Sequence, residues 1–180
     1  MRTSIFLLLL LFPLSLYADL KVEYTSIKDS FSARFPHDPA VEEHKDTKSE
    51  RRDYSATETD KGIIEYKISY LNMTGNESFS SLNEVEQRQL VEVFYSTYAR
   101  GFGDDVVELS KRLYEFDGTY PAVDYKLLAF HGNKKGKFII RGFTVFRLGK
   151  VINTTLLYTG NTDSFPEEKY QEFIKSIRFK

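Results

Sequence analysis

The sequence predicts an α+β protein, an α/β/α sandwich whose central, mainly antiparallel sheet is flanked by a long middle helix and a C-terminal helix. Three observations carry this prediction. Segments with the two-residue period of strands are joined by short polar links, which favours antiparallel neighbours. Two other segments, one in the middle and one at the end, repeat apolar residues at helical spacing. Some strands are apolar on both faces, so both faces of the sheet must be covered.

The N-terminal half of the chain is expected to form strands. Residues 20–24 and 31–35 each alternate apolar and polar side chains, which predicts a hairpin. Residues 40–60 are strongly charged, and within them we expect only a short strand around 52–57. A longer strand follows and ends at a polar turn over 72–78. Its apolar face consists of Ile64, Tyr66, Ile68 and Tyr70.

Two amphipathic helices are expected. The first begins at a capping box made by Ser81 and Glu84 and ends at Gly101. Its apolar stripe consists of Leu82, Val85, Leu90, Val93, Phe94 and Thr97. The second helix is capped in the same way by Ser164 and Glu167. Its apolar face, which must dock on the sheet, consists of Tyr170, Phe173, Ile174 and Ile177.

Three or four further strands are predicted between the helices, over 106–116, 122–130, 138–148 and 151–158. Tight links rich in glycine and lysine join them, which indicates antiparallel hairpins. The third segment carries apolar side chains on both of its faces, so we expect it in the centre of the sheet.

The order of these elements and four local strings resemble the PsbP-like family, the fold of the photosystem II extrinsic protein PsbP and of DcrB-like exported bacterial proteins. The strings are Phe31–Pro36 with Pro39, Gly118–Ala122, Arg141–Tyr158 and Phe173–Phe179. The resemblance covers nearly all of one domain, residues 19–180, and implies the sandwich fold. Because these strings are structural, it implies no particular activity beyond the protein binding that is common among members.

Residues 1–18 are predicted to be a cleavable signal peptide. Arg2 precedes an apolar run from Ile5 to Leu16, and Ala18 is a small residue at the cleavage position. The run has about twelve residues, whereas a membrane-spanning helix needs roughly twenty, which disfavours an anchor. The mature chain is therefore expected to be periplasmic or secreted, without stable insertion into a membrane.

Composition excludes several classes of protein. The chain has 25 Lys and Arg against 26 Asp and Glu, and loss of Arg2 with the signal leaves 24 against 26, a charge of −2. A general nucleic-acid binder needs a concentrated basic face instead. There is no cysteine, hence no thiol nucleophile, thiolate metal site, disulfide or lipid anchor. The motifs of hydrolases and the phosphate-binding glycine loops are also missing, so we predict a non-enzyme without a cofactor.

An acidic segment, residues 36–46, is the candidate metal site. It contains His37, His44 and Asp46, and imidazole with carboxylate suits a divalent ion. The histidines are widely spaced and no regular element is expected there, so ordinary solvated charge is the competing interpretation.

A second set of residues is predicted to contact a partner protein. The set consists of Tyr95, Tyr98, Arg100, Lys134, Lys135 and Lys137. The tyrosines and the arginine lie outside the apolar stripe of the middle helix, and both residue types are enriched at protein interfaces. The lysines are expected at the tip of a hairpin, where charged residues are also common simply because the turn is exposed to solvent.

Together these observations favour an exported, non-catalytic protein-binding or accessory domain of the cell envelope, with an envelope or secreted protein as its partner. The alternative is a carrier of a small ligand or divalent metal that uses residues 36–46.

Overall fold

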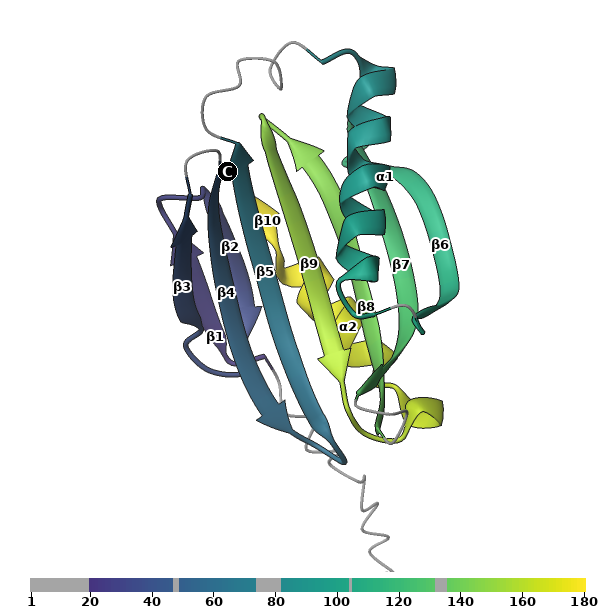
Figure 1. The fold of residues 1–180 in the computed structure, drawn as a ribbon. Coiled ribbons are helices and arrows are strands. Elements are labelled where there is room, and N and C mark those ends of the chain that lie inside the picture. Colours follow the sequence, from purple (N-terminus) through teal and green to yellow (C-terminus); the bar gives the residue numbers. More distant parts are fainter. Residues whose placement is uncertain (1–19, 47–48, 74–81, 104, 132–135) are drawn as a thin grey trace, which may run out of the picture.

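Two antiparallel sheets and two α-helices make up the part of the chain that the computed structural model describes, residues 20–46, 49–73, 82–103, 105–131 and 136–180 (Figure 1). The predicted α+β class with a mainly antiparallel sheet and two helices is confirmed. The predicted signal peptide lies outside the described residues. None of the described helices has the length and apolar character needed to span a membrane.

The larger sheet has seven strands in the order β3-β4-β5-β9-β8-β7-β6, and every neighbouring pair is antiparallel. Its strands are β3 (Ala40–Lys45), β4 (Ser49–Thr59), β5 (Ile63–Met73), β6 (Val107–Phe116), β7 (Tyr120–His131), β8 (Gly136–Arg147) and β9 (Lys150–Tyr158). The smaller sheet contains β1 (Val22–Ser26), β2 (Phe31–Phe35) and β10 (Arg178–Phe179), with β2 in the middle. The predicted N-terminal hairpin is therefore confirmed as β1 and β2.

One face of the larger sheet carries α1 (Glu84–Arg100), which contacts β7 and β8 (Figure 1). Val91 and Tyr95 of α1 pack there against Val123 and Tyr125 of β7. Figure 1 shows no described helix in front of β3, β4 and β5 on this side. The helix therefore covers only one half of this face and leaves the other half open.

The opposite face of the larger sheet carries the smaller sheet together with α2 (Glu167–Ser176), which contacts β2. The core on this side joins Phe31 and Phe35 of β2 with Phe173 of α2 and with tyrosines of β4 and β5. The predicted apolar face of α2 is confirmed, since Tyr170, Phe173 and Ile177 are buried. Strand β8 contributes to the cores on both faces, as its sequence predicted.

The charged segment 40–60 differs from the prediction, because it forms an edge strand, β3, and a long strand, β4, rather than one short strand. All residues of β3 are exposed. An edge strand of this kind is held by backbone hydrogen bonds to one neighbour, and charged side chains protect its free edge from pairing with other chains. It therefore lacks the apolar alternation by which strands are recognised in a sequence.

Both predicted helix caps are displaced. The capping box of α1 is formed by Asn83 and Glu86, whose side chains each accept a hydrogen bond from the backbone N–H of the other. Ser164 lies in a short 3-10 helix, and its hydroxyl donates to the carbonyl of Asn161, whereas Pro166 precedes α2 without a side-chain cap. Several serines and asparagines near each helix start satisfy the capping pattern, and only the backbone path selects among them.

The apolar stripe of α1 is also rotated relative to the prediction. Val85 and Val93 are 63% and 61% exposed, while Tyr95 is only 4% exposed. The helix turns its tyrosines toward the sheet because a phenol can bury its ring and still donate its hydroxyl to a neighbour. Tyr95 does this by donating to Glu108 of β6 over 2.5 Å.

Candidate functional site

A cleft of about 320 Å³ lies between the second half of α1 and the adjoining open half of the sheet. Its wall is apolar and consists of Phe94 and Tyr98 of α1. Its floor is the sheet, which carries the apolar Leu71 and Val151 beside the polar residues Asp53, Ser69, Thr144 and Asn153. Arg51, Lys67 and Thr97 complete the lining. An apolar wall above a few polar groups is the usual composition of a binding site.

The polar residues of the floor form a row across four neighbouring strands. Asp53 of β4 is paired with Ser69 of β5, which is paired with Asn153 of β9, and this is paired in turn with Thr144 of β8. Residues in direct register point to the same face of a sheet, so these four side chains stand together. Because α1 lies mainly over β7 and β8 and not in front of β4, the row emerges from beneath the helix onto the open face.

Asp53 is the most unusual group of this floor. It is 3% exposed, and its Oδ2 lies 2.9 Å from Nζ of Lys67, 3.4 Å from Nε of Arg51 and 4.0 Å from Nε2 of His44. Its Oδ1 is buried and has no hydrogen-bond partner among the described residues. A buried acceptor without a partner costs about 1–3 kcal/mol. A hydrogen-bond donor that reached Oδ1 when a molecule binds would supply the partner that this oxygen lacks among the described residues.

Two other polar residues of the floor, Asn153 and Thr144, are hydrogen-bonded within the protein. Oδ1 of Asn153 accepts hydrogen bonds from the hydroxyls of Tyr125 and Thr144, at 2.7 and 3.0 Å. Tyr98 packs against Phe102 and Tyr125 at ring-centroid distances of 5.0 and 6.2 Å. Burial raises the pKa of Tyr98 to about 12, so its phenol is neutral at physiological pH. Among the described residues, Asp53 is the one floor residue with a buried side-chain oxygen that lacks a hydrogen-bond partner.

The predicted partner-binding residues are dispersed. The ring of Tyr95 is buried between α1 and the sheet, where it is not available to a partner, whereas Tyr98 is half-buried and lines the cleft. Arg100 is exposed, and its Nε donates to the carbonyl of Ser96. Lys137 is exposed on β8. Lys134 and Lys135 lie outside the described residues.

The predicted metal ligands are not gathered into a site. The ring nitrogens of His37 lie 2.9 and 3.0 Å from the carbonyls of Asp38 and Thr57. Asp46 accepts hydrogen bonds from Ser49 at the link between β3 and β4. His44 faces the Asp53 side of β4 instead. In the described ranges, no group of three or more His, Cys, Asp or Glu side chains is placed to hold a metal ion.

The sequence contained one unused signal for this site. Arg51, Arg52 and Asp53 are consecutive charged residues inside a strand. Successive side chains of a strand point to opposite faces, so three such residues in an inner strand cannot all reach solvent. Arg52 and Asp53 are indeed buried, on opposite faces of β4.

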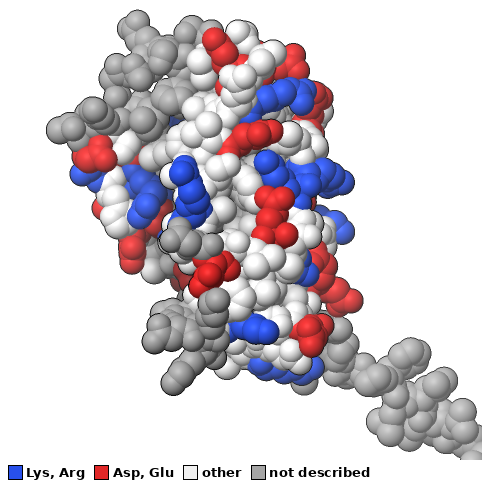
Figure 2. Space-filling model, turned by 45° about the vertical axis from the view of Figure 1, so that its right-hand side comes forward, with Lys and Arg blue, Asp and Glu red and all other residues white. Residues whose placement is uncertain are grey.

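The charges on the α1 side of the molecule are mixed. Figure 2 shows Lys and Arg interspersed with Asp and Glu over this face, without an extended area of one sign. Ion pairs such as Arg88 with Glu84, at 2.9 Å, and Lys111 with Glu92, at 3.9 Å, account for part of this pattern. This face therefore lacks the basic surface that would attract a polyanion.

The fold and the cleft define the class, an α+β protein with a helix-flanked antiparallel sheet and an open cleft beside one helix. The sequence matches no known protein-family model and no curated protein. Among solved structures, the cyanobacterial PsbP protein CyanoP of Synechocystis sp. PCC 6803 is similar with a TM-score of 0.50 and 13% identity. The match covers 88% of this chain and 92% of CyanoP.

Two other solved structures are similar at a lower level. The Ran-binding protein Mog1p of Saccharomyces cerevisiae has a TM-score of 0.48 and 10% identity over 88% of this chain and 94% of Mog1p. Protein PA94 of Pseudomonas aeruginosa, of unknown function, has a TM-score of 0.45 and 12% identity over 83% of this chain and 89% of PA94. At such identities the likeness concerns the fold alone.

Proposed function

We propose that this chain is an exported, non-catalytic, protein-binding domain of the PsbP-like type, and that the cleft beside α1 is its binding site. The observation that carries the proposal is the unpartnered Oδ1 of Asp53 at the floor of an apolar-walled cleft. The fold likeness to CyanoP supports the PsbP-like sandwich, and the apolar run behind Arg2 supports export to the periplasm or the exterior.

The cleft indicates which chemistry the partner presents. Its volume of about 320 Å³ is sufficient for one large side chain, and its apolar wall favours an aromatic one. Lys67 and Arg51 already compensate the charge of Asp53, so a further cation would be repelled. The group that fits is a neutral N–H or O–H donor on an aromatic body, as in tryptophan or tyrosine. Both residues are common at the centres of protein interfaces.

A partner can reach the cleft from the open half of the sheet. Thr97 is exposed at the helix side of the cleft, and the side chains of Arg51 and Lys67 are 50% and 31% exposed at the sheet side. We therefore expect the partner to lie over β4 and β5 and to insert one aromatic side chain beneath α1.

Site-specific crosslinking tests this proposal. A benzophenone amino acid at Thr97 should capture one dominant protein in the host, whereas the same group at Lys137 should not capture it. The captured protein is then purified and titrated against two variants of adjacent exposed helix residues, Thr97→Trp and Ser96→Trp. Thr97→Trp fills the cleft and should weaken binding about thirtyfold, the loss expected for a contact worth about 2 kcal/mol.

Ser96→Trp adds the same bulk outside the cleft and should change the affinity less than about twofold. Equal melting temperatures for the two variants would show that both remain folded. The proposal fails if Thr97 captures nothing that Lys137 does not, or if both tryptophan variants weaken binding to the same extent.

A further inference from the structure

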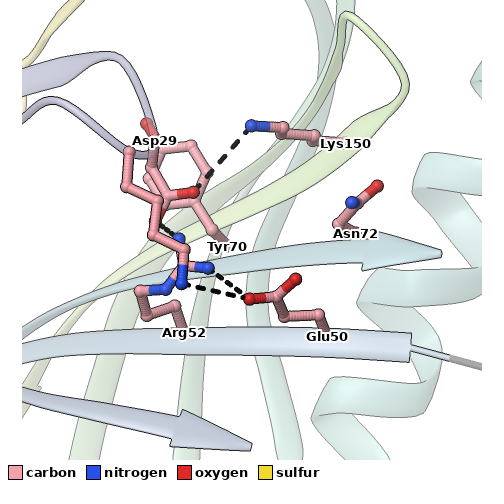
Figure 3. A pocket seen from close by; sticks show the side chains of 7 residues that line it. Asp29, Glu50, Arg52, Tyr70, Asn72 and Lys150 are labelled. Carbon is pink, nitrogen blue, oxygen red and sulfur yellow. Dashed lines mark hydrogen bonds and ion pairs between the residues drawn. The ribbon is translucent and has the colours of Figure 1, made fainter. Parts of the chain in front are cut away.

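A second cavity, of about 140 Å³, lies on the opposite face of the sheet from the cleft, next to the turn between β1 and β2 (Figure 3). The six residues labelled in Figure 3 all line it and all carry polar or charged groups: Asp29, Glu50, Arg52, Tyr70, Asn72 and Lys150. They come from the β1–β2 turn and from strands β4, β5 and β9. The cavity is therefore polar, whereas the core on this side of the sheet consists largely of aromatic side chains.

In one part of this cavity, the polar groups already have hydrogen-bond partners within the protein. The guanidinium of Arg52, a residue that is 5% exposed, donates to Glu43 over 3.0 Å and to Asp29 and Glu50 over 2.5 Å each. Oδ2 of Asp29 also accepts from the hydroxyl of Tyr54 over 2.6 Å. Arg52 and this oxygen are fully engaged by the protein itself, so neither is the group that awaits a ligand.

In the other part of the cavity, several polar groups lack a hydrogen-bond partner among the described residues. Nζ of Lys150 lies 3.8 Å from Oδ1 of Asp29, which is beyond hydrogen-bond distance. Within the described part of the chain, the side chain of Asn72 and Oε2 of Glu50 make no hydrogen bond, and the hydroxyl of Tyr70 is buried without a partner. The open groups are three that can donate, Lys150, Asn72 and the hydroxyl of Tyr70, and two carboxylate oxygens, Oδ1 of Asp29 and Oε2 of Glu50.

The strand register keeps these groups apart and in order. Glu50 of β4 is paired with Asn72 of β5, which is paired with Lys150 of β9. Direct neighbours across a sheet are about 5 Å apart, so Glu50 and Lys150 stand about 10 Å apart at the backbone with Asn72 between them. Figure 3 shows this arrangement, with the carboxylate of Asp29 facing Lys150.

We infer that this cavity binds a small zwitterion, a free α-amino acid of about the size of glycine, alanine or serine. Its carboxylate would accept hydrogen bonds from Lys150 and Asn72, and its ammonium group would donate to Oδ1 of Asp29 and to Glu50. A lone anion would face the carboxylates unpaired, and a lone cation would face Lys150. The volume of about 140 Å³ equals that of about five water molecules, which restricts the ligand to a few heavy atoms.

The cavity carries charges of both signs, which suits a ligand that also carries one charge of each sign. Lys28, Arg52 and Lys150 line it together with Asp29 and Glu50. Outside the lining, Glu43 binds Arg52 and Lys28, and Lys45 pairs with Glu50. The side chains of Lys28 and Lys150 are 53% and 32% exposed, so the cavity is accessible to solvent next to these two lysines.

Thermal unfolding of the purified chain tests this inference, with glycine, L-alanine and L-serine as probes. We expect the melting temperature to rise by about 5–10 °C when a probe reaches a hundred times its dissociation constant. Acetate, methylammonium and the larger L-phenylalanine should give no rise at equal concentration and ionic strength. Calorimetric titration of the same probes would give the affinities.

Two variants test whether the amino acid binds in this cavity. Lys150→Met removes the group that would hold the carboxylate and should weaken binding at least tenfold. Lys45→Met is the control, because Lys45 also pairs with Glu50, at 3.6 Å, but is 63% exposed and does not line the cavity. The inference is wrong if no zwitterion raises the melting temperature, if acetate acts equally well, or if Lys150→Met binds as the parent does. Asn72→Ala gives a second test should Lys150→Met fail to fold.

Discussion

Arg52→Met is the substitution whose effect depends most directly on the tertiary structure. Arg52 is 5% exposed and binds Asp29, which is itself 8% exposed. Methionine keeps the length and the apolar stem of the side chain but removes its charge and its hydrogen bonds. The carboxylate of Asp29 then stays buried with only the hydroxyl of Tyr54, at 2.6 Å, and the more distant Lys150 as partners.

The size of the effect follows from that environment. Removing one partner of a buried ion pair costs about 3–5 kcal/mol, because the other charge is left without compensation. Since Tyr54 and Lys150 remain beside Asp29, we expect the lower end, about 3 kcal/mol, which corresponds to a fall of about 6–12 °C in melting temperature. The double variant Asp29→Asn with Arg52→Met should lose less stability than Arg52→Met alone, because no buried charge remains.

Urea denaturation followed by circular dichroism measures these differences, and Arg51→Met is the matched control. Arg51 is the preceding residue, but its side chain is 50% exposed on the opposite face and its pair with Asp53, at 3.4 Å, is backed by Lys67. Its loss should cost at most about 1 kcal/mol. Equal losses for Arg51→Met and Arg52→Met, or a loss below about 1 kcal/mol for Arg52→Met, would refute the reasoning.

Three further predictions concern the cores. Phe173→Ala should lower the free energy of unfolding by about 3–5 kcal/mol, because the ring is fully buried between α2 and the sheet; a loss no larger than that of the exposed Lys175→Ala would contradict this. Burial raises the pKa of Tyr54 from 10.0 to about 12, so its stabilising effect should be complete below pH 10 and lost as the pH rises toward 12. Unfolding that precedes any tyrosinate absorbance would disprove that linkage. Gly142→Ala should cost about 1–3 kcal/mol, since a Cβ would lie 2.5 Å from the carbonyl oxygen of Thr154, and unchanged urea denaturation would contradict that contact.

Local periodicity was sufficient for the elements whose side chains alternate between a core and an exposed environment. The strand containing Ile64, Tyr66 and Ile68 was predicted because its apolar side chains repeat every second residue, and all three are buried. The C-terminal helix was predicted for the same kind of reason. In contrast, β3 carries no apolar pattern, because it is held by backbone hydrogen bonds and by polar side chains such as Glu43, which binds Arg52, so periodicity gave no sign of it.

The buried face of α1 differs from the predicted apolar stripe at Val93 and Tyr95. The stripe predicted from helical spacing included the aliphatic Val93 and left Tyr95 and Tyr98 outside it. The structure reverses the positions of Val93 and Tyr95, since the hydroxyl of Tyr95 finds Glu108 on β6. That neighbour is 13 positions away in the chain, and no local pattern contains it.

The sequence by itself determined the α+β class, most strands and the buried face of the last helix, because each depends on neighbouring residues in the chain. Only the tertiary structure decided the cleft and the charged cavity. The cleft floor needs the register that aligns Asp53, Ser69, Asn153 and Thr144 across four strands. That alignment depends on β9 lying between β5 and β8, and the paired residues of β5 and β9 are 78 to 94 positions apart in the chain, from Asn72 with Lys150 to Ile64 with Tyr158. Long-range pairing of this kind is set by the packing of both faces of the sheet together, so no single segment encodes it.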